Sequence, residues 1–250
     1  IVSLGFKIGA APMQLWIPDV YQGAPTPITA FLSVASKAAG FGIAITILRP
    51  FLESPTTQNS VVTILVVMAA ATLIYGNLAA LPQKNFKRLL AYSSIAHAGF
   101  LLLGLATSSF SAVLFYLATY LIMTFAAFFI IALIRREEGS EEIDALNGLA
   151  KRNPLLSISL SIIMASMAGL PLTAGFVGKF KIFSAALTNL DKIGWLAIII
   201  AFIGAAAGFY YYFKIIRAMY WFNTSKENAI VLPTITKLSL AILTIALLVL

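Results

Sequence analysis

Residues 169–178 read Gly-Leu-Pro-Leu-Thr-Ala-Gly-Phe-Val-Gly, and they lie inside an apolar segment that runs from Pro154 to about Leu190. At about 1.5 Å per residue, one helix over that segment would be about 55 Å long, whereas the hydrocarbon core of a membrane is about 30 Å thick. Proline removes a backbone donor, and glycine tolerates non-helical dihedral angles. The stretch therefore predicts a transmembrane helix that is broken near its middle, with Lys179 directly after the break.

The composition of the whole chain is that of a membrane protein. Of its 250 residues, 60% are hydrophobic and 10% are charged, and the mean hydropathy is +0.96. Soluble domains carry about a quarter charged residues. The lack of cysteine excludes disulfides, thiolate-bound iron–sulfur clusters and thiol catalysis, and one histidine with nine acids leaves little for a metal site. We therefore expect an all-α polytopic membrane protein with no cofactor of its own.

Apolar runs of helix length divide the chain into about eight spans. The first is interrupted around Pro12 and Pro18, and the second begins at Thr26, as an N-cap followed by proline, and ends before Pro50. Because the first and last runs look incomplete, we expect a piece of a longer protein. The expected spans are residues 1–13, 26–49, 61–81, 86–106, 111–134, 154–190, 194–221 and 232 onward.

Basic residues gather in alternate loops, as the positive-inside rule requires of a membrane protein. Only Arg49 and Lys192 occupy the other loops, and the clusters lack the stacking aromatic residues of a nucleic-acid groove, so no nucleic acid is expected. The acidic connector 135–153 is predicted to be a solvated cytoplasmic loop, with a docking role as the alternative. Residues 208–214 are predicted to form an aromatic belt at the membrane surface. The clustered basic residues are Lys84, Lys87, Arg88, Arg135, Arg136, Lys151, Arg152, Lys214, Arg217 and Lys226.

Four titratable residues lie inside the spans or beside their breaks. They are Lys7, Lys37, His97 and Lys179, and the span centres hold no Asp or Glu to neutralise them. A lysine at the centre of a membrane costs about 2.5–3.5 kcal/mol on insertion scales. Internal water, a carboxylate from outside this sequence or a neutral lysine would reduce that cost. Each of these options describes a group that can exchange a proton, so we predict proton transfer by these four residues.

Structural interpretations of the same residues stay open at this stage. Ser93 and Ser94 lie four and three residues before His97 and can satisfy it by hydrogen bonding. A lysine near a helix end, such as Lys181, can extend to the membrane surface. Asp19 is expected to anchor a loop or cap a helix, with a gating role as the alternative.

Several motifs of the chain match a known family. They are Gly5-Phe6-Lys7, residues 16–27 from Trp16 to Pro27, Ser36-Lys37, residues 87–97 from Lys87 to His97, and residues 169–180 from Gly169 to Phe180. Together they resemble the antiporter-like membrane subunits of respiratory complex I (NDH-1). Within these, Asp19-Val20-Tyr21 and Gly23 are similar to the N-type subunit, whereas L and M subunits and Mrp antiporters usually have Asp-Ala-His there. The resemblance extends to about Phe222.

This resemblance implies an antiporter-like fold with inverted repeats, in which the seventh and twelfth helices are broken. Lys7 then matches the lysine of the seventh helix, Lys37 that of the eighth and Lys179 that of the twelfth. The family's glutamate partner for Lys7 lies on a fifth helix, which this sequence does not contain. Residues 1–222 would form the antiporter-type domain, and residues 223–250 a linker and a truncated last helix.

The function that the resemblance implies is proton translocation by NADH:quinone oxidoreductase, along Lys7, Lys37, His97 and Lys179, driven by electron transfer in other subunits. NADH, FMN, iron–sulfur clusters and quinone would then bind to partner subunits. The expected partners are subunits of the M, K, L, A and J types and the lipid bilayer. The expected location is the bacterial cytoplasmic membrane, with a thylakoid-type membrane as the alternative. A Mrp-type cation/proton antiporter and a non-conducting structural subunit remain open as other functions.

Overall fold

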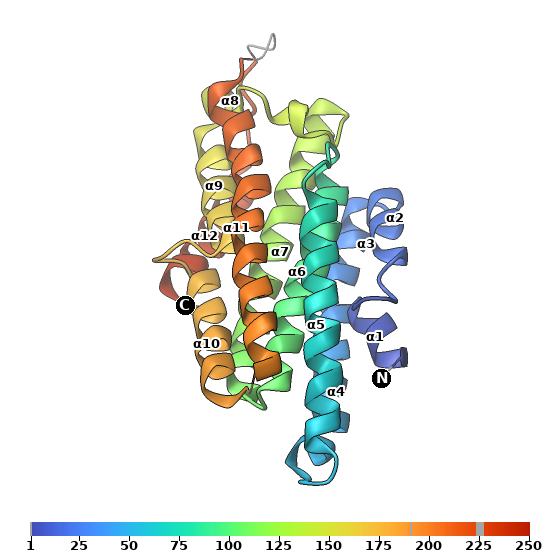
Figure 1. Ribbon diagram of the computed structural model, residues 1–250. Helices are drawn as coiled ribbons and strands as arrows, with labels where there is room; N and C mark the ends of the chain where they lie inside the picture. The colour runs from blue at the N-terminus through green and yellow to red at the C-terminus, as the bar shows by residue number, and fades with distance from the viewer. Residues whose placement is uncertain (1, 191, 224–227) are drawn as a thin grey trace.

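The computed structural model describes residues 2–190, 192–223 and 228–250, and these residues are almost entirely helical (Figure 1). The isolated bridge between Asn85 and Glu142 is the one β-type pairing in the described ranges. The elements are α1 (Val2–Ile8), α2 (Trp16–Gly23), α3 (Thr26–Phe31), the π-helical turn η1 (Leu32–Ser36), α4 (Lys37–Glu53), α5 (Gln58–Ala80), α6 (Phe86–Ala106), α7 (Phe110–Glu138), the 3₁₀ turn η2 (Ile143–Leu146), α8 (Leu149–Arg152), α9 (Pro154–Ala168), α10 (Ala174–Asn189), α11 (Lys192–Trp221) and α12 (Thr234–Val249).

The predicted all-α membrane fold is confirmed. Among the described residues, five helices are long and apolar enough to cross a membrane. These helices are residues 26–53, 58–80, 86–106, 110–138 and 194–221. Part of the predicted linker, residues 224–227 with Lys226, lies outside the described residues, and so does the side chain of Lys192.

Helix α6 is the centre of the bundle. Apart from Arg88, all of its residues are buried, and it contacts α2, α5, α7, α10 and α11. In Figure 1, α5 runs directly in front of it and α7 beside it. Small residues allow this close packing: a Cβ on Gly76 of α5 would lie 2.5 Å from the backbone N of Ala96, and one on Gly99 would lie 2.7 Å from the Cγ of Leu73. The polar residues of α6 are therefore enclosed by protein.

The break predicted in the long segment is confirmed, but it is shorter than expected. Helix α9 ends at Gly169, whose φ of 89° is left-handed, and α10 begins after Thr173, whose hydroxyl accepts a hydrogen bond from the N–H of Phe176. Gly175 and Gly178, which were expected in the break, are helical. Their lack of a side chain serves packing instead, because a Cβ on Gly175 would lie 1.8 Å from the carbonyl oxygen of Ser166.

The first predicted span is also broken, between Ile8 and Trp16, and this break contains Pro12. The expectation that Pro18 also interrupts the helix is wrong, because Pro18 lies in the first turn of α2. Backbone N–H groups in the first turn have no hydrogen-bond partner within the helix, so proline is tolerated there. The predicted helix end before Pro50 is also wrong: α4 continues to Glu53, so the proline lies in its last turn. Thr26 is the first helical residue of α3, and Pro25 occupies the N-cap position.

The basic loops meet at one end of the bundle, as the charge pattern predicts. Lys214 of α11 donates a hydrogen bond to the carbonyl of Gln83, 2.8 Å away, which joins two of these loops. In Figure 1 this end is the upper one, and the α4–α5 turn with Arg49 is at the lower end. Arg49 pairs there with Glu53 at 2.7 Å.

The prediction that the acidic connector is solvated holds for Glu137, Glu142 and Asp144, which are exposed, but not for Glu138 and Glu141. Glu141 pairs with Lys87 at 3.1 Å and with Arg135 at 2.7 Å, and the side chain of Lys87 is only 1% exposed. Arg152 pairs with Glu138 at 2.5 Å, where both side chains are nearly buried. The connector therefore packs onto the ends of α6, α7 and α9. Two of its acids neutralise basic residues that the sequence pattern predicted to be solvent-exposed.

Candidate functional site

Three of the four predicted proton-transfer residues are buried in the bundle. The exposed fraction is 3% for Lys37, 2% for His97 and 6% for Lys179. An aromatic ring lies between each lysine and the histidine. Tyr120 has its ring 5.2 Å from the Nζ of Lys37 and 5.1 Å from the ring of His97, and Phe100 lies 5.0 Å from the Nζ of Lys179 and 6.5 Å from His97. The structure thus brings these three residues into one connected cluster.

Lys37 is positioned by an irregular turn of its own helix. The π-helical turn Leu32–Ser36 directly precedes it, and its Nζ donates hydrogen bonds to the carbonyl oxygen of Ser94 at 2.5 Å and to the Oγ of Ser94 at 2.9 Å. A π-helical turn carries an extra residue, which changes the direction of the residues that follow, and such turns are frequent at functional sites. Hydropathy contains no signal for it, so the sequence did not predict this turn.

His97 is held on both sides by tyrosine hydroxyl groups. Its Nδ1 lies 2.6 Å from the hydroxyl of Tyr116 in α7, and its Nε2 lies 3.0 Å from the hydroxyl of Tyr212 in α11. The expectation that Ser93 and Ser94 satisfy His97 directly is wrong. Ser93 bonds the hydroxyl of Tyr212, and Ser94 binds Lys37.

The sequence analysis missed the tyrosines of this site, Tyr116, Tyr120 and Tyr212, and it misplaced the last of them. Residues 208–214 were predicted to form an aromatic belt at the membrane surface, but Tyr211 and Tyr212 are each only 2% exposed. Helix α11 continues to Trp221, which places Tyr212 about 13 Å from the helix end at about 1.5 Å per residue. This distance could have shown from the sequence that Tyr212 is not a belt residue, since belt residues lie at the level of the lipid headgroups. Tyr210, by contrast, is exposed.

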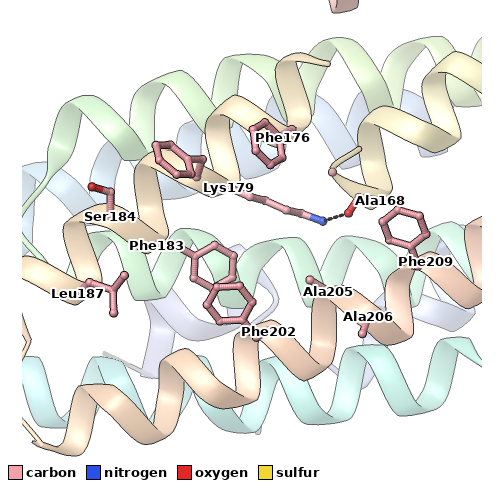
Figure 2. A pocket seen from close by; sticks show the side chains of 12 residues that line it. Ala168, Phe176, Lys179, Phe183, Ser184, Leu187, Phe202, Ala205, Ala206 and Phe209 are labelled. Atoms are coloured by element: carbon pink, nitrogen blue, oxygen red, sulfur yellow. Dashed lines mark hydrogen bonds between the residues drawn. The ribbon is translucent and has the colours of Figure 1, made fainter. Parts of the chain in front are cut away.

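Lys179 lies in the second turn of α10, and its ammonium group is at the end of α9. Its Nζ donates to the carbonyl oxygens of Met167 and Ala168, both at 2.8 Å, and these are the last two residues of α9 (Figure 2). Helix α9 ends there, so these carbonyls have no partner further along the helix, and the helix dipole concentrates partial negative charge at this end. The break thus forms a binding place for a lysine ammonium group without using a carboxylate.

An apolar cavity of about 430 Å³ adjoins Lys179 between the α9–α10 break and α11. Lys179 is the one charged residue among those that line it. Figure 2 shows its side chain extended along the cavity wall toward Ala168, with Phe183 and Phe202 stacked on the other side at 4.3 Å between ring centroids. The other lining residues are Gly169, Phe176, Phe180, Ser184, Leu187, Ala205, Ala206 and Phe209.

Lys7 stands apart from the cluster. Its side chain is exposed on α1 and makes no hydrogen bond or ion pair with any described residue. Its Cγ lies against α4, 3.2 Å from where a Cβ on Gly40 would be. The predicted role of Lys7 in proton transfer stays a prediction.

Asp19 and Lys181 lie on the surface of the described protein. Asp19 pairs with Arg88 at 2.9 Å and so ties α2 to α6, as the anchor interpretation expects. Lys181 lies over the ring of Phe115 at 4.1 Å. The described residues contain no group of three or more His, Asp or Glu side chains that could hold a metal ion.

Comparisons with known proteins agree with this architecture. The family described as NADH:quinone oxidoreductase/Mrp antiporter, TM, matches residues 1–208. Over 231 residues the chain is 46% identical to NADH-quinone oxidoreductase subunit N of Chlorobium chlorochromatii (strain CaD3), which covers 88% of this chain and 44% of that relative. The chain thus spans about half the length of the curated relatives it matches.

Two solved structures share the fold. A chain of respiratory complex I from Thermus thermophilus with bound aureothin superposes with a TM-score of 0.82 at 37% identity, covering 99% of this chain and 54% of that one. A chain of the membrane-bound sulfane sulfur reductase, an archaeal respiratory membrane complex, gives a TM-score of 0.87 at 32% identity, with 97% and 50% coverage. The expected antiporter-like fold is therefore confirmed.

Proposed function

Because the chain belongs to the NADH:quinone oxidoreductase/Mrp antiporter transmembrane family, we propose that it is part of the proton-translocating N-type subunit of an NADH:quinone oxidoreductase. The observation that carries the proposal is the buried row of Lys37, His97 and Lys179. Neither Lys37 nor Lys179 forms an ion pair with a carboxylate of the described residues. Two buried basic groups and a histidine between them are expensive for a structural core, and proton transfer explains their presence.

The ligands of the two lysines support proton exchange. Lys37 and Lys179 are each bound by uncharged oxygens: a serine carbonyl and hydroxyl for the first, and two carbonyls for the second. Such oxygens accept hydrogen bonds from an ammonium and from a neutral amine alike, whereas a carboxylate would hold the proton by its charge. Each lysine can therefore lose a proton while it keeps its position.

Electrostatic repulsion gives the row a means of passing charge along. At an effective dielectric constant of about 20, two unit charges at an illustrative separation of about 8 Å repel by about 2 kcal/mol. A proton that arrives at one member therefore favours release from the next. In the proposed mechanism, Lys37 and Lys179 exchange protons through His97, and Lys7 connects the row to the rest of the subunit.

The rest of the machinery belongs to other subunits in this proposal. NADH, FMN, iron–sulfur clusters and quinone bind there, and electron transfer changes the charge at one end of the row. Neighbouring subunits of the M, K, L, A and J types are the proposed partners, in a bacterial cytoplasmic membrane. Residues 1–222 form the conducting domain, and residues 223–250 supply a linker and the last helix.

The test is Lys37→Ala in the full-length subunit, assembled in the complex and reconstituted in proteoliposomes. We expect fewer protons pumped for each NADH oxidised. The matched control is Lys181→Ala, since Lys181 is an exposed lysine that faces Phe115, outside the row. Wild-type pumping by Lys37→Ala at an unchanged rate of NADH oxidation would overturn the proposal, and so would sodium-driven proton movement in vesicles that contain no NADH-oxidising subunits.

A further inference from the structure

His97 is bonded at both ring nitrogens by groups that can each donate and accept a proton. We propose that Tyr116 and Tyr212 carry protons to and from His97, so that Ser93, Tyr212, His97 and Tyr116 form one conducting chain between the Lys37 side and the Lys179 side of the bundle. This inference rests on the proposed function and assigns it two further residues.

The hydrogen bonds of this proton chain are short, and the residues that form them are buried. Tyr116 and Nδ1 of His97 are 2.6 Å apart, Nε2 and Tyr212 are 3.0 Å apart, and the hydroxyl of Tyr212 also bonds the Oγ of Ser93. All four residues are at most 2% exposed. They come from three different helices, α6, α7 and α11, so the chain exists only in the folded bundle.

The two ends of the chain lie next to the two lysines. Ser93 is followed in α6 by Ser94, whose oxygens bind the Nζ of Lys37. Tyr116 lies against Gly178, the residue before Lys179: a Cβ on Gly178 would be 2.5 Å from the Cδ2 of Tyr116. Tyr116 therefore packs directly on the helix that carries Lys179.

Phe100 is the side chain between Tyr116 and Lys179. Its ring lies 6.3 Å from that of Tyr116 and 5.0 Å from the Nζ of Lys179. No hydrogen bond joins Tyr116 to Lys179, or Ser93 to Ser94 or Lys37, within the described ranges. In our proposal water therefore carries the proton over both of these intervals.

Transfer along the chain conserves protons and leaves no charge behind. When a proton reaches Ser93, Ser93 passes its own hydroxyl proton to the oxygen of Tyr212, and Tyr212 passes its proton to Nε2 of His97. The proton on Nδ1 then moves to Tyr116, which releases its own proton on the far side. One proton enters and one leaves, and the ring changes tautomer. The hydroxyl groups then rotate back, and the imidazole ring must reorient so that its protonated nitrogen again faces Tyr116 before a second proton can pass in the same direction.

The neighbouring residue Tyr211 is an equally buried tyrosine whose hydroxyl group is bonded to a side chain that cannot pass a proton on. It is as buried as Tyr212, but its hydroxyl donates to the Oδ1 of Asn77 at 3.1 Å, and the amide of Asn77 donates to the carbonyl of Leu73 at 2.9 Å. An amide nitrogen cannot accept the next proton, so that branch ends at a carbonyl. His97, in contrast, has a hydroxyl on each side, and hydroxyls fit either tautomer.

The experiment replaces each phenol by a ring of the same shape. Tyr212→Phe and Tyr116→Phe are introduced separately into the full-length subunit of the assembled complex, with Tyr211→Phe as the matched control. We expect each of the first two to slow proton pumping in proteoliposomes by roughly a hundredfold, the lower end of the range for loss of a positioned proton-transfer group. Tyr211→Phe is expected to pump at the wild-type rate.

The solvent isotope effect distinguishes proton transfer by the tyrosines from a purely structural role of the tyrosines in the fold. If the tyrosines conduct, the ratio of pumping rates in H₂O and D₂O rises above the wild-type value in Tyr212→Phe and Tyr116→Phe, because proton transfer becomes limiting. Wild-type pumping in both variants would overturn the inference. A loss of assembled complex with an unchanged isotope effect would overturn it too, since the phenols would then only support the fold. If both tyrosine variants pump normally while Lys37→Ala pumps poorly, only the proposed tyrosine pathway is rejected. If Lys37→Ala itself pumps normally, the proposed function is rejected.

Discussion

The Nζ of Lys179 lies 2.8 Å from the carbonyl oxygen of Ala168, so a side chain from the second half of the broken helix caps the first half. The same ammonium group bonds Met167. The proposed function gives this residue a proton-transfer role in addition to its structural one, and substitutions can separate the two.

Lys179→Arg should keep the cap and lose the proton exchange. A guanidinium can donate to both carbonyls of α9, but it does not lose its proton in proteins. We expect the complex to assemble and to pump far fewer protons per NADH. Lys179→Met should also lower the amount of assembled complex, because two carbonyls then lack a donor. Quantitative pumping assays and native gels measure the two effects. Pumping by Lys179→Arg at the wild-type stoichiometry would show that this lysine does not exchange protons.

Gly178→Ala should disturb Tyr116 and, through it, His97. The new Cβ would lie 2.5 Å from the Cδ2 of Tyr116, so the ring or the helix must move. Overpacking of this kind costs about 1–3 kcal/mol. We expect a lower thermal inactivation temperature and slower pumping. Gly42→Ala is the control, since nothing lies within 4 Å of a Cβ at Gly42. Equal behaviour of the two variants would contradict the close contact.

Ser94→Ala should weaken the hold on Lys37 without removing it. The Oγ at 2.9 Å is lost, whereas the carbonyl at 2.5 Å remains. Hydrogen bonds to charged groups contribute about 1.5–3 kcal/mol. We therefore expect a pumping defect that is clear but smaller than that of Lys37→Ala, measured in the same vesicles. A defect as large as that of Lys37→Ala would mean that the hydroxyl has a role beyond binding.

Glu141→Gln should destabilise the protein and leave the buried row intact. The carboxylate neutralises Lys87, which is otherwise bonded to the carbonyl of Ala24 at 2.7 Å, and it also pairs with Arg135. Leaving a buried charge with fewer partners costs about 1–3 kcal/mol. Thermal inactivation should therefore occur at a lower temperature, while the protons pumped per NADH stay at the wild-type value. Glu137→Gln, at an exposed position, is the control.

The sequence predicted the features that follow from hydropathy and backbone chemistry. Apolar length predicted the five long helices that the described residues contain, and Gly169 and Pro171 predicted the break between Ala168 and Ala174. The depth of Lys37, His97 and Lys179 followed from counting residues along a helix. These quantities are local, so one sequence is enough to estimate them.

The partners of the site residues could not be predicted in this way. Tyr212 meets His97 because α11 crosses α6 at that level, and nothing in either segment alone specifies the crossing. The same holds for Glu141 and Lys87, which the charge pattern placed in water. Such contacts depend on how helices pack, and helix packing depends on small residues such as Gly76 that hydropathy does not distinguish.

Helix α6 is enclosed by other helices over its whole length. Lipid therefore does not touch Ser93, Ser94 or His97, and a change in bilayer thickness or lipid composition can reach them only by moving the surrounding helices. The buried polar side chains of this helix are therefore separated from the lipid of the membrane by protein. Vesicles of different acyl-chain length should consequently alter the assembly of the subunit more than its transport chemistry.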